Sequence, residues 1–256
     1  DRNNDYELAS TMATKPTVLA SAASTQSQDL SLHVGTAELG EDPRPWLYQY
    51  PGILRTESIV ALNAKGLGVV TATPEIDGVT RRIPLVVNVQ SKLYPAFALE
   101  VLRVGLDHPS YQLKTTPEGI DWIRVPGYPL MKTDGNGRIF LDWNTKFYKQ
   151  TVSEFMASPI DAPFAIIGVT AEGVVNPTPT PAGLKYPHEV QANILHNLIN
   201  GSAPSTPIWA PAGELLGLTL GLLLVALTVS SIYISAPVIF SLIGGSMFGA
   251  WYLFQS

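Results

Sequence analysis

The pattern of polar and apolar residues divides the chain into two parts near Trp209. Before this point, short apolar runs alternate with polar stretches and prolines. After it, from Leu215 to Phe254, there are 40 consecutive residues without a charged side chain. A helix that crosses a bilayer needs about 20 apolar residues, so the tail is long enough for two passes. The pattern therefore predicts a water-soluble domain over residues 1–207, followed by a segment embedded in a lipid bilayer.

The apolar tail is predicted to form two transmembrane helices, at residues 212–230 and 237–254. Serines and Pro237 interrupt the apolar run between them, and proline is suited to the first turn of a helix. The alternative is a helical hairpin buried within a soluble protein. That alternative is disfavoured because a soluble core rarely covers two helices that are apolar on every side. No Lys or Arg follows Lys185, so the distribution of positive charge cannot orient the helices.

The soluble part is predicted to have an α/β fold, with a mixed sheet flanked by helices. β-Branched and apolar runs mark the strands, and 3.6-residue periodicity marks the helices. Residues 23–58 are expected to be mostly loop, with a short strand at Leu30–Val34. The strands are expected at Thr17–Ala20, Gly66–Ala72, Val79–Val89, Trp122–Val125, Arg138–Trp143 and Phe164–Val169, and the helices at Asp5–Ala13, from Pro95 onward and at His188–Asn200.

Two glycine-containing turns are expected to join neighbouring strands. Asp77-Gly78 lies between Gly66–Ala72 and Val79–Val89, where glycine tolerates the positive φ of a hairpin. The glycine-rich stretch at residues 134–137 lies between the strands at Trp122–Val125 and Arg138–Trp143. It lacks the Lys-Ser/Thr ending of a phosphate-binding loop, so the sequence favours a plain turn there.

Composition excludes several classes of function. The chain has 16 Lys and Arg against 21 Asp and Glu, a net charge of −5. Nucleic acid is therefore not expected as a partner, because binding to phosphates requires clustered cations. The chain contains no cysteine, which excludes disulfides and thiolate metal sites. No feature of the sequence points to a cofactor.

Five short motifs occur in order along residues 1–207. They are DGVTRRIPL at Asp77–Leu85, YPAFALE at Tyr94–Glu100, FAIIGVTA at Phe164–Ala171, PTPAG at Pro179–Gly183 and HEVQANILHNL at His188–Leu198. Together with the apolar tail, they resemble the second type of CHASE domain. This domain is the extracytoplasmic sensory module of bacterial membrane receptors.

The resemblance implies the layout of a transmembrane signalling receptor in the bacterial inner membrane. Such receptors have one membrane helix, a sensor on the periplasmic side, usually three more helices, and a cytoplasmic output enzyme. An adenylate or guanylate cyclase is the favoured output, with a kinase as another form. The chain is then expected to begin inside the sensor, to lack the output enzyme and to catalyse no reaction itself. Its expected partners are the lipid bilayer, an extracytoplasmic signal and a second copy in a homodimer.

Three residues are candidates for binding the signal: Arg82, His188 and Glu189. The Arg81-Arg82 pair could bind an anion, although adjacent residues of a strand point to opposite faces. His188-Glu189 lacks the second histidine that a zinc protease places four residues after the first, since the next one is His196. A simpler interpretation is that His188 caps a helix. No catalytic residue and no metal site are predicted.

Three functions are weighed for the domain. The first is a ligand sensor, in which the signal binds one of two conformations more tightly and thereby moves the membrane helices. The second is an envelope module for protein interaction or dimerisation that has no small ligand. The third, an envelope enzyme, would require a nucleophile beside a base. No Gly-x-Ser-x-Gly motif supports it.

Overall fold

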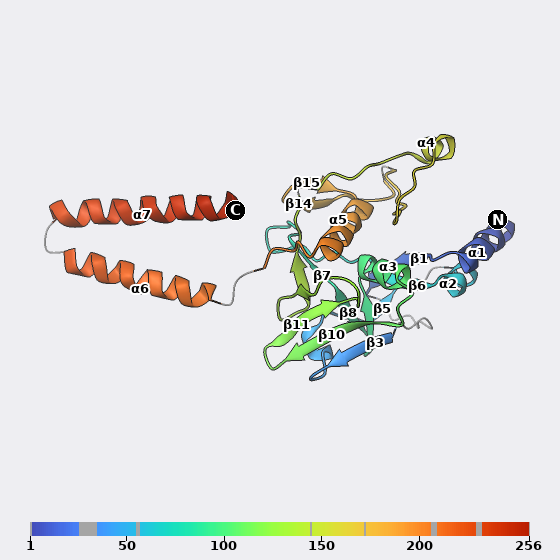
Figure 1. Cartoon of the computed structure of the whole chain (residues 1–256), viewed down its shortest axis with the longest axis horizontal. Coiled ribbons are helices and arrows are strands. Elements are labelled where there is room, and N and C mark those ends of the chain that lie inside the picture. The colour runs from blue at the N-terminus through green and yellow to red at the C-terminus, as the bar shows by residue number, and fades with distance from the viewer. Residues whose placement is uncertain are drawn as a thin grey trace. The chain divides into compact units, whose positions relative to one another are not determined.

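The computed structural model forms two compact units, Asp1–Ser205 and Thr206–Ser256 (Figure 1). It describes residues 2–25, 35–54, 57–143, 145–171, 173–205, 209–228 and 232–255. The first unit mixes helices and strands, which confirms the predicted α/β class. Its helices are α1 (Arg2–Thr14), the 3₁₀ turn η1 (Arg44–Trp46), α2 (Ser58–Asn63), α3 (Phe97–Gly105), α4 (Val152–Ala157) and α5 (Pro187–Asn200).

A parallel strand pair forms the base on which helix α3 packs. Strand β1 (Val18–Ser21) runs beside β6 (Gly66–Val69) in parallel register. All four residues of β6 are buried, as expected for a strand covered on both faces. A Cβ added to Gly68 would lie 2.3 Å from the Cα of Phe97. Glycine at this position therefore allows the first turn of α3 to approach the backbone of β6.

The largest sheet has four strands and mixed direction. Strand β10 pairs in parallel with β3 and antiparallel with β11, and β12 follows at the edge. Residues of β10 alternate strictly between half-buried and buried positions, which gives the sheet one core face. The strands are β3 (Gly35–Leu39), β10 (Ser110–Thr116), β11 (Gly119–Arg124) and β12 (Met131–Lys132).

Short strand pairs and a small three-stranded sheet complete the unit. The pairs are β2 (Ala23–Ser24) with β5 (Gly52–Ile53), β7 (Arg82–Pro84) with β13 (Arg138–Phe140), and β14 (Thr178–Thr180) with β15 (Gly183–Lys185). The three-stranded sheet has the strand order β4 (Gln49–Tyr50), β8 (Val86–Val89), β9 (Lys92–Pro95). The main apolar core lies between the mixed sheet and helices α3 and α5. It includes Leu99, Leu102, Tyr111, Leu113 and Ile194.

Several predicted elements are confirmed. The helix expected at Asp5–Ala13 is α1, and the strand expected at Thr17–Ala20 is β1. The helix expected at His188–Asn200 is α5, and it ends at Gly201 in the left-handed conformation, with φ of 64°. A glycine there satisfies the last carbonyls of the helix without a steric penalty. The strand expected at Leu30–Val34 lies outside the described residues.

The prediction of a buried strand at Phe164–Val169 is wrong. The segment has no regular secondary structure, and Phe164 and Ile166 pack against the main core. Ile167 points the other way and is 92% exposed. Among the residues that the structure describes, no strand pairs with this segment. Its alternating side chains match a strand, but a strand also requires a hydrogen-bonded neighbour.

Both predicted hairpins pair differently from expectation. Gly78 does lie in a tight turn, closed by a hydrogen bond from Glu75 N–H to the Val79 carbonyl. However, β6 pairs with β1, and β7 pairs with β13 rather than with its neighbour in sequence. The turn at residues 134–137 is likewise present, but it joins β12 to β13, which do not pair with each other. The pairing of buried strands depends on how they pack in the core. The sequence of a turn does not determine this packing.

The hairpin of β8 and β9 was not predicted, because its turn contains no glycine. Strands β8 and β9 are joined by Gln90 and Ser91, which adopt positive φ angles of 50° and 67°. This left-handed pair matches the twist of the strands on either side. Pro95 ends β9 rather than opening the following helix, which starts at Phe97. The region at residues 23–58 also contains several short strands instead of mostly loop.

The second unit is a pair of apolar helices, α6 (Ala210–Thr228) and α7 (Ile232–Gln255). Within α6, Ala210–Leu227 is long and apolar enough to cross a membrane, and none of it is buried. In α7 the apolar stretch Ala236–Gly249 is shorter. One helix is thus a strong candidate for a membrane span. The helix predicted to begin at Pro237 starts earlier, so that Pro237 lies within its second turn.

Candidate functional site

Arg82 is held in a network of ion pairs. Its Nε donates to Glu75 Oε1 at 2.8 Å, and its Nη1 donates to Asp134 Oδ2 at 3.3 Å. Its guanidinium carbon lies 5.3 Å from the centroid of the Phe140 ring. Two carboxylates therefore balance the charge of this candidate residue.

Arg81 joins the same network, although adjacent strand residues were expected to diverge. It precedes strand β7, and its guanidinium bonds both Asp77 at 2.7 Å and Glu75 at 3.2 Å. The hydrogen bond from Arg81 lowers the pKa of Asp77 to about 2. Arg138 pairs with Asp134 at 2.7 Å. All three guanidinium groups are thus paired, and an anion that bound here would have to displace a carboxylate.

Glu189 closes the first turn of helix α5. Its Oε2 accepts a hydrogen bond from Tyr186 N–H at 2.7 Å, and its Oε1 contacts Lys149 Nζ. Burial acts to raise the pKa of Glu189, but the bonds from Lys149 and from the Tyr186 backbone outweigh it and lower the pKa. The capping group of this helix is therefore Glu189 and not His188 as expected. A carboxylate here also complements the positive end of the helix dipole.

His188 packs against aromatic and backbone surfaces at the same helix start. Its ring is nearly parallel to that of Tyr186, with an angle of 14° and 5.9 Å between centroids. A Cβ added to Gly168 would lie 2.3 Å from the Cγ of the His188 ring. The Nδ1 atom is buried and has no hydrogen-bond partner among the described residues. Burial lowers the pKa of His188, and Glu189 partly opposes this effect.

The structure brings two of the three candidate residues together. His188 and Glu189 share the first turn of α5, whereas Arg82 belongs to β7. Within the described part of the chain, no hydrogen bond or ion pair joins Arg82 to the other two. The same part contains no cluster of three acidic or histidine residues that could hold a metal ion. His196 lies farther along α5, with its ring edge-on to Phe147 at 6.1 Å.

Two buried amides fasten α5 to the rest of the unit. The Gln191 Oε1 accepts a hydrogen bond from the Ala98 N–H at the start of α3, at 3.3 Å. The Asn197 side chain forms a two-point bond with the backbone of Asp142, at 3.1 and 3.4 Å. Sequence reasoning missed both residues. The sequence does show amide side chains on the apolar face of this helix. A buried amide is unfavourable unless it forms hydrogen bonds, so these positions indicated polar contacts in the core.

Helix α3 contains a buried ion pair that sequence reasoning also missed. Glu100 is 0% exposed and binds Arg103 through two bonds of 2.6 and 2.8 Å. Burial raises the pKa of Glu100, and Arg103 opposes this effect. Arg103 also donates to the His108 carbonyl at 2.6 Å. The spacing of three residues on one helix face was visible in the sequence, but the burial was not.

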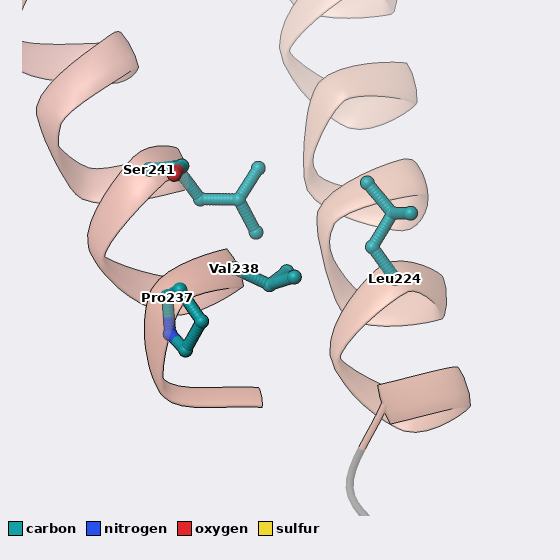
Figure 2. Close-up of a pocket in the computed structure, with 5 residues that line it drawn as sticks. Leu224, Pro237, Val238 and Ser241 are labelled. Carbon is teal, nitrogen blue, oxygen red and sulfur yellow. The ribbon is translucent and has the colours of Figure 1, made fainter. Parts of the chain in front are cut away.

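A shallow apolar groove lies between the two helices of the second unit (Figure 2). It is lined by Leu224 of α6 and by Pro237, Val238, Ser241 and Leu242 of α7. Leu224 and Val238 point toward each other across the groove (Figure 2). Four glycines of these helices make no close contact between them. Within the described residues, a Cβ at Gly217, Gly221, Gly245 or Gly249 would meet no heavy atom within 4 Å.

Comparison with known protein families identifies the family of this chain. The family model of the CHASE2 domain matches residues 1–229. The chain belongs to the CHASE2 domain family. CHASE2 domains are extracytoplasmic sensors of membrane receptors, which confirms the resemblance found in the five motifs. The match covers all of α5 and α6 and extends past the boundary at 207 that was expected for the sensor. No curated protein and no solved structure matches the chain.

Arg103→Ala is expected to destabilise the CHASE2 unit by about 3–5 kcal/mol, because it leaves the Glu100 carboxylate buried without a countercharge. The measurement is denaturant unfolding of the whole chain in detergent micelles. Adding Glu100→Gln to Arg103→Ala should restore part of the loss, since a neutral amide needs no countercharge. Equal stability of the single and double variants would contradict the role assigned to the ion pair.

Proposed function

We propose that this chain is the signal-sensing region of a bacterial inner-membrane receptor, with residues 1–205 on the periplasmic side. The proposal is supported by membership of the CHASE2 family and by the apolar helix α6. Helix α7 is proposed as a second membrane pass, so that the turn between the helices faces the cytoplasm. The proposed output of the parent receptor is an adenylate or guanylate cyclase, as the family resemblance suggests.

The observation that carries this proposal is the attachment of α5. This helix is the last element of the sensor unit, and nine residues, 201–209, connect it to α6. Because Gln191 and Asn197 bond α5 to α3 and to the Asp142 backbone, a rearrangement of the core is transmitted to α5. A signal that binds one arrangement more tightly than another would thus bias the position of α6.

The absence of cysteine makes the proposed topology testable with single substitutions. Ile76→Cys places a thiol on a fully exposed side chain of the sensor unit, Tyr233→Cys places one near the turn between the helices, and Gln255→Cys places one at the end of α7. In intact cells that make the parent receptor, an impermeant thiol reagent should label Ile76→Cys and Gln255→Cys. Tyr233→Cys should react only after the membrane is permeabilised.

The controls separate the parts of this topology. The unsubstituted chain should remain unlabelled, provided that any cysteine elsewhere in the parent receptor is replaced. Labelling of Ile76→Cys only after permeabilisation would place the sensor in the cytoplasm and refute the proposal. If Tyr233→Cys and Gln255→Cys are both protected in intact cells while Ile76→Cys is labelled, α6 crosses the membrane but α7 does not.

Coupling is tested by Asn197→Ala, which removes the two-point bond to the Asp142 backbone. We expect the basal output of the parent receptor in membranes to change about fivefold, which corresponds to a coupling free energy of about 1 kcal/mol. The matched control is Asn200→Ala, which removes the same side chain from an exposed position at the end of α5. Output equal to that of the native receptor in both variants, with Asn197→Ala correctly folded, would contradict coupling through α5.

A protein-interaction or dimerisation module is the second candidate, and one feature favours it. Residues 148–174 carry apolar side chains that are at least 72% exposed. Contiguous apolar patches on a surface mark protein contacts, and Val152 and Met156 are neighbours on α4, four residues apart. The most exposed apolar residues in this range, with their exposed fractions, are Tyr148 at 77%, Val152 at 74%, Met156 at 77%, Ile167 at 92% and Val174 at 72%.

If this second function holds, Met156→Ser should shift the solubilised chain from dimer to monomer in light-scattering measurements. Leu62→Ser, at a 67% exposed position outside these residues, should leave the mass unchanged. A mass that is the same in both variants and in the native chain would exclude this patch as the dimer contact. The homodimer expected for the receptor would then form elsewhere.

A further inference from the structure

The start of helix α5 contains the His188 imidazole, whose Nδ1 is buried. In the cation this nitrogen would carry a proton for which no acceptor is present among the described residues. A neutral histidine ring can leave Nδ1 bare when its proton lies on Nε2, whereas the cation carries a donor on both nitrogens. Nδ1 of His188 is sealed from water and has no partner in the described residues. A buried donor without an acceptor costs about 1–3 kcal/mol. Protonation therefore opposes the packed position of this ring.

The charges around His188 add to this effect. From its own helix, Glu189 faces it and favours the cation. From the segment at residues 145–149, Lys149 opposes the cation, and Lys149 also neutralises Glu189. From strand β15, Lys185 lies close enough to act on Glu189. The segment at residues 164–169 contributes no titratable group. The positive end of the helix dipole further disfavours a cation at this position.

The surface that packs on the ring is weakly held. Segment 164–169 has no backbone hydrogen bond among the described residues. Phe164 and Ile166 fix its first half against the main core, and Phe164 lies over Gly105. Its second half contacts α5 where Gly168 meets His188. Loss of this contact would loosen the second half of the segment without breaking any strand pairing.

We propose that the contact between Gly168 and the His188 ring is an acid-sensitive latch. It is closed when the imidazole is neutral and opens when the ring binds a second proton, which releases residues 167–169 from the start of α5. The ligand of this site is then the proton. The latch rests on the proposed function only for its consequence, which is that external acidity would act on the helix leading to α6. Its opening is a property of the sensor unit itself.

The test is a distance measurement between two spin labels on the whole chain in detergent micelles. Because the chain lacks cysteine, Ile167→Cys and Asn200→Cys provide two unique sites on exposed positions of the segment and of α5. Between about pH 7.5 and about pH 5, we expect a longer and broader distance distribution to rise about tenfold in population, as an imidazole titrates in this range.

Three companion variants identify the group responsible. His188→Phe retains a flat ring without a titratable nitrogen and should hold the short distance at both pH values. Gly168→Ala introduces the clashing Cβ and should show the long distance at both. His196→Gln removes another histidine from the same helix and should leave the pH response intact. A response that persists in His188→Phe, or that is absent from the chain with native His188, refutes the latch.

A second measurement covers the case in which His188→Phe fails to pack. Nuclear magnetic resonance of the histidine rings gives the titration midpoint of His188 directly, assigned by its loss in His188→Phe. That midpoint should lie below the ordinary histidine value of 6.5 and should coincide with the midpoint of the distance change. A midpoint at or above 6.5, or one that differs from that of the distance change, overturns the proposal. None of these readouts depends on receptor output, so the latch and the proposed function can fail separately.

Discussion

The placement of one carboxylate, Glu100, constrains the whole sensor unit. A charge removed from water must be paired, because an isolated buried ion costs several kcal/mol. Arg103 supplies the pairing from the same helix. Gly66 leaves room for this carboxylate, since a Cβ there would lie 2.3 Å from Glu100 Oε1. The ion pair lies within helix α3, and strand β6 packs closely against it because glycine leaves room for the buried carboxylate.

Helix α5 is attached to this centre by two kinds of interaction. Val190, Ile194 and Leu198 supply the apolar area that favours packing, and this contribution is largely insensitive to small displacements. Gln191 and Asn197 bond to single backbone groups, so they specify the position of the helix along its axis. The apolar residues thus provide stability, and the amides fix the position of α5 within the unit.

The sequence predicted the helices and strands that are determined by residues close to one another in the chain. The apolar tail, helices α1 and α5, and strands β1 and β6 follow from periodicity and turn residues, and the ordered motifs identify the family. What it could not predict depends on contacts between distant segments. The choice of β13 as partner for β7 and the burial of Glu100 both arise only when the chain is packed. Arg82 shows the same limit: a pair of arginines suggested an anion site, but Glu75 and Asp134, the latter 52 residues away, already occupy it.

These contacts also indicate which part of the sensor a signal can move at least cost. An anion at Arg82 would have to displace carboxylates from a network in which Arg81, Arg82 and Arg138 are all paired. A rearrangement of α3 would expose Glu100. At the start of α5, in contrast, no backbone hydrogen bond among the described residues holds segment 164–169, and Gly168 packs on the His188 ring. A conformational equilibrium responds most readily where the two states differ by a small free energy. The start of α5 is the part of the described sensor that meets this condition, and it lies on the last helix before α6.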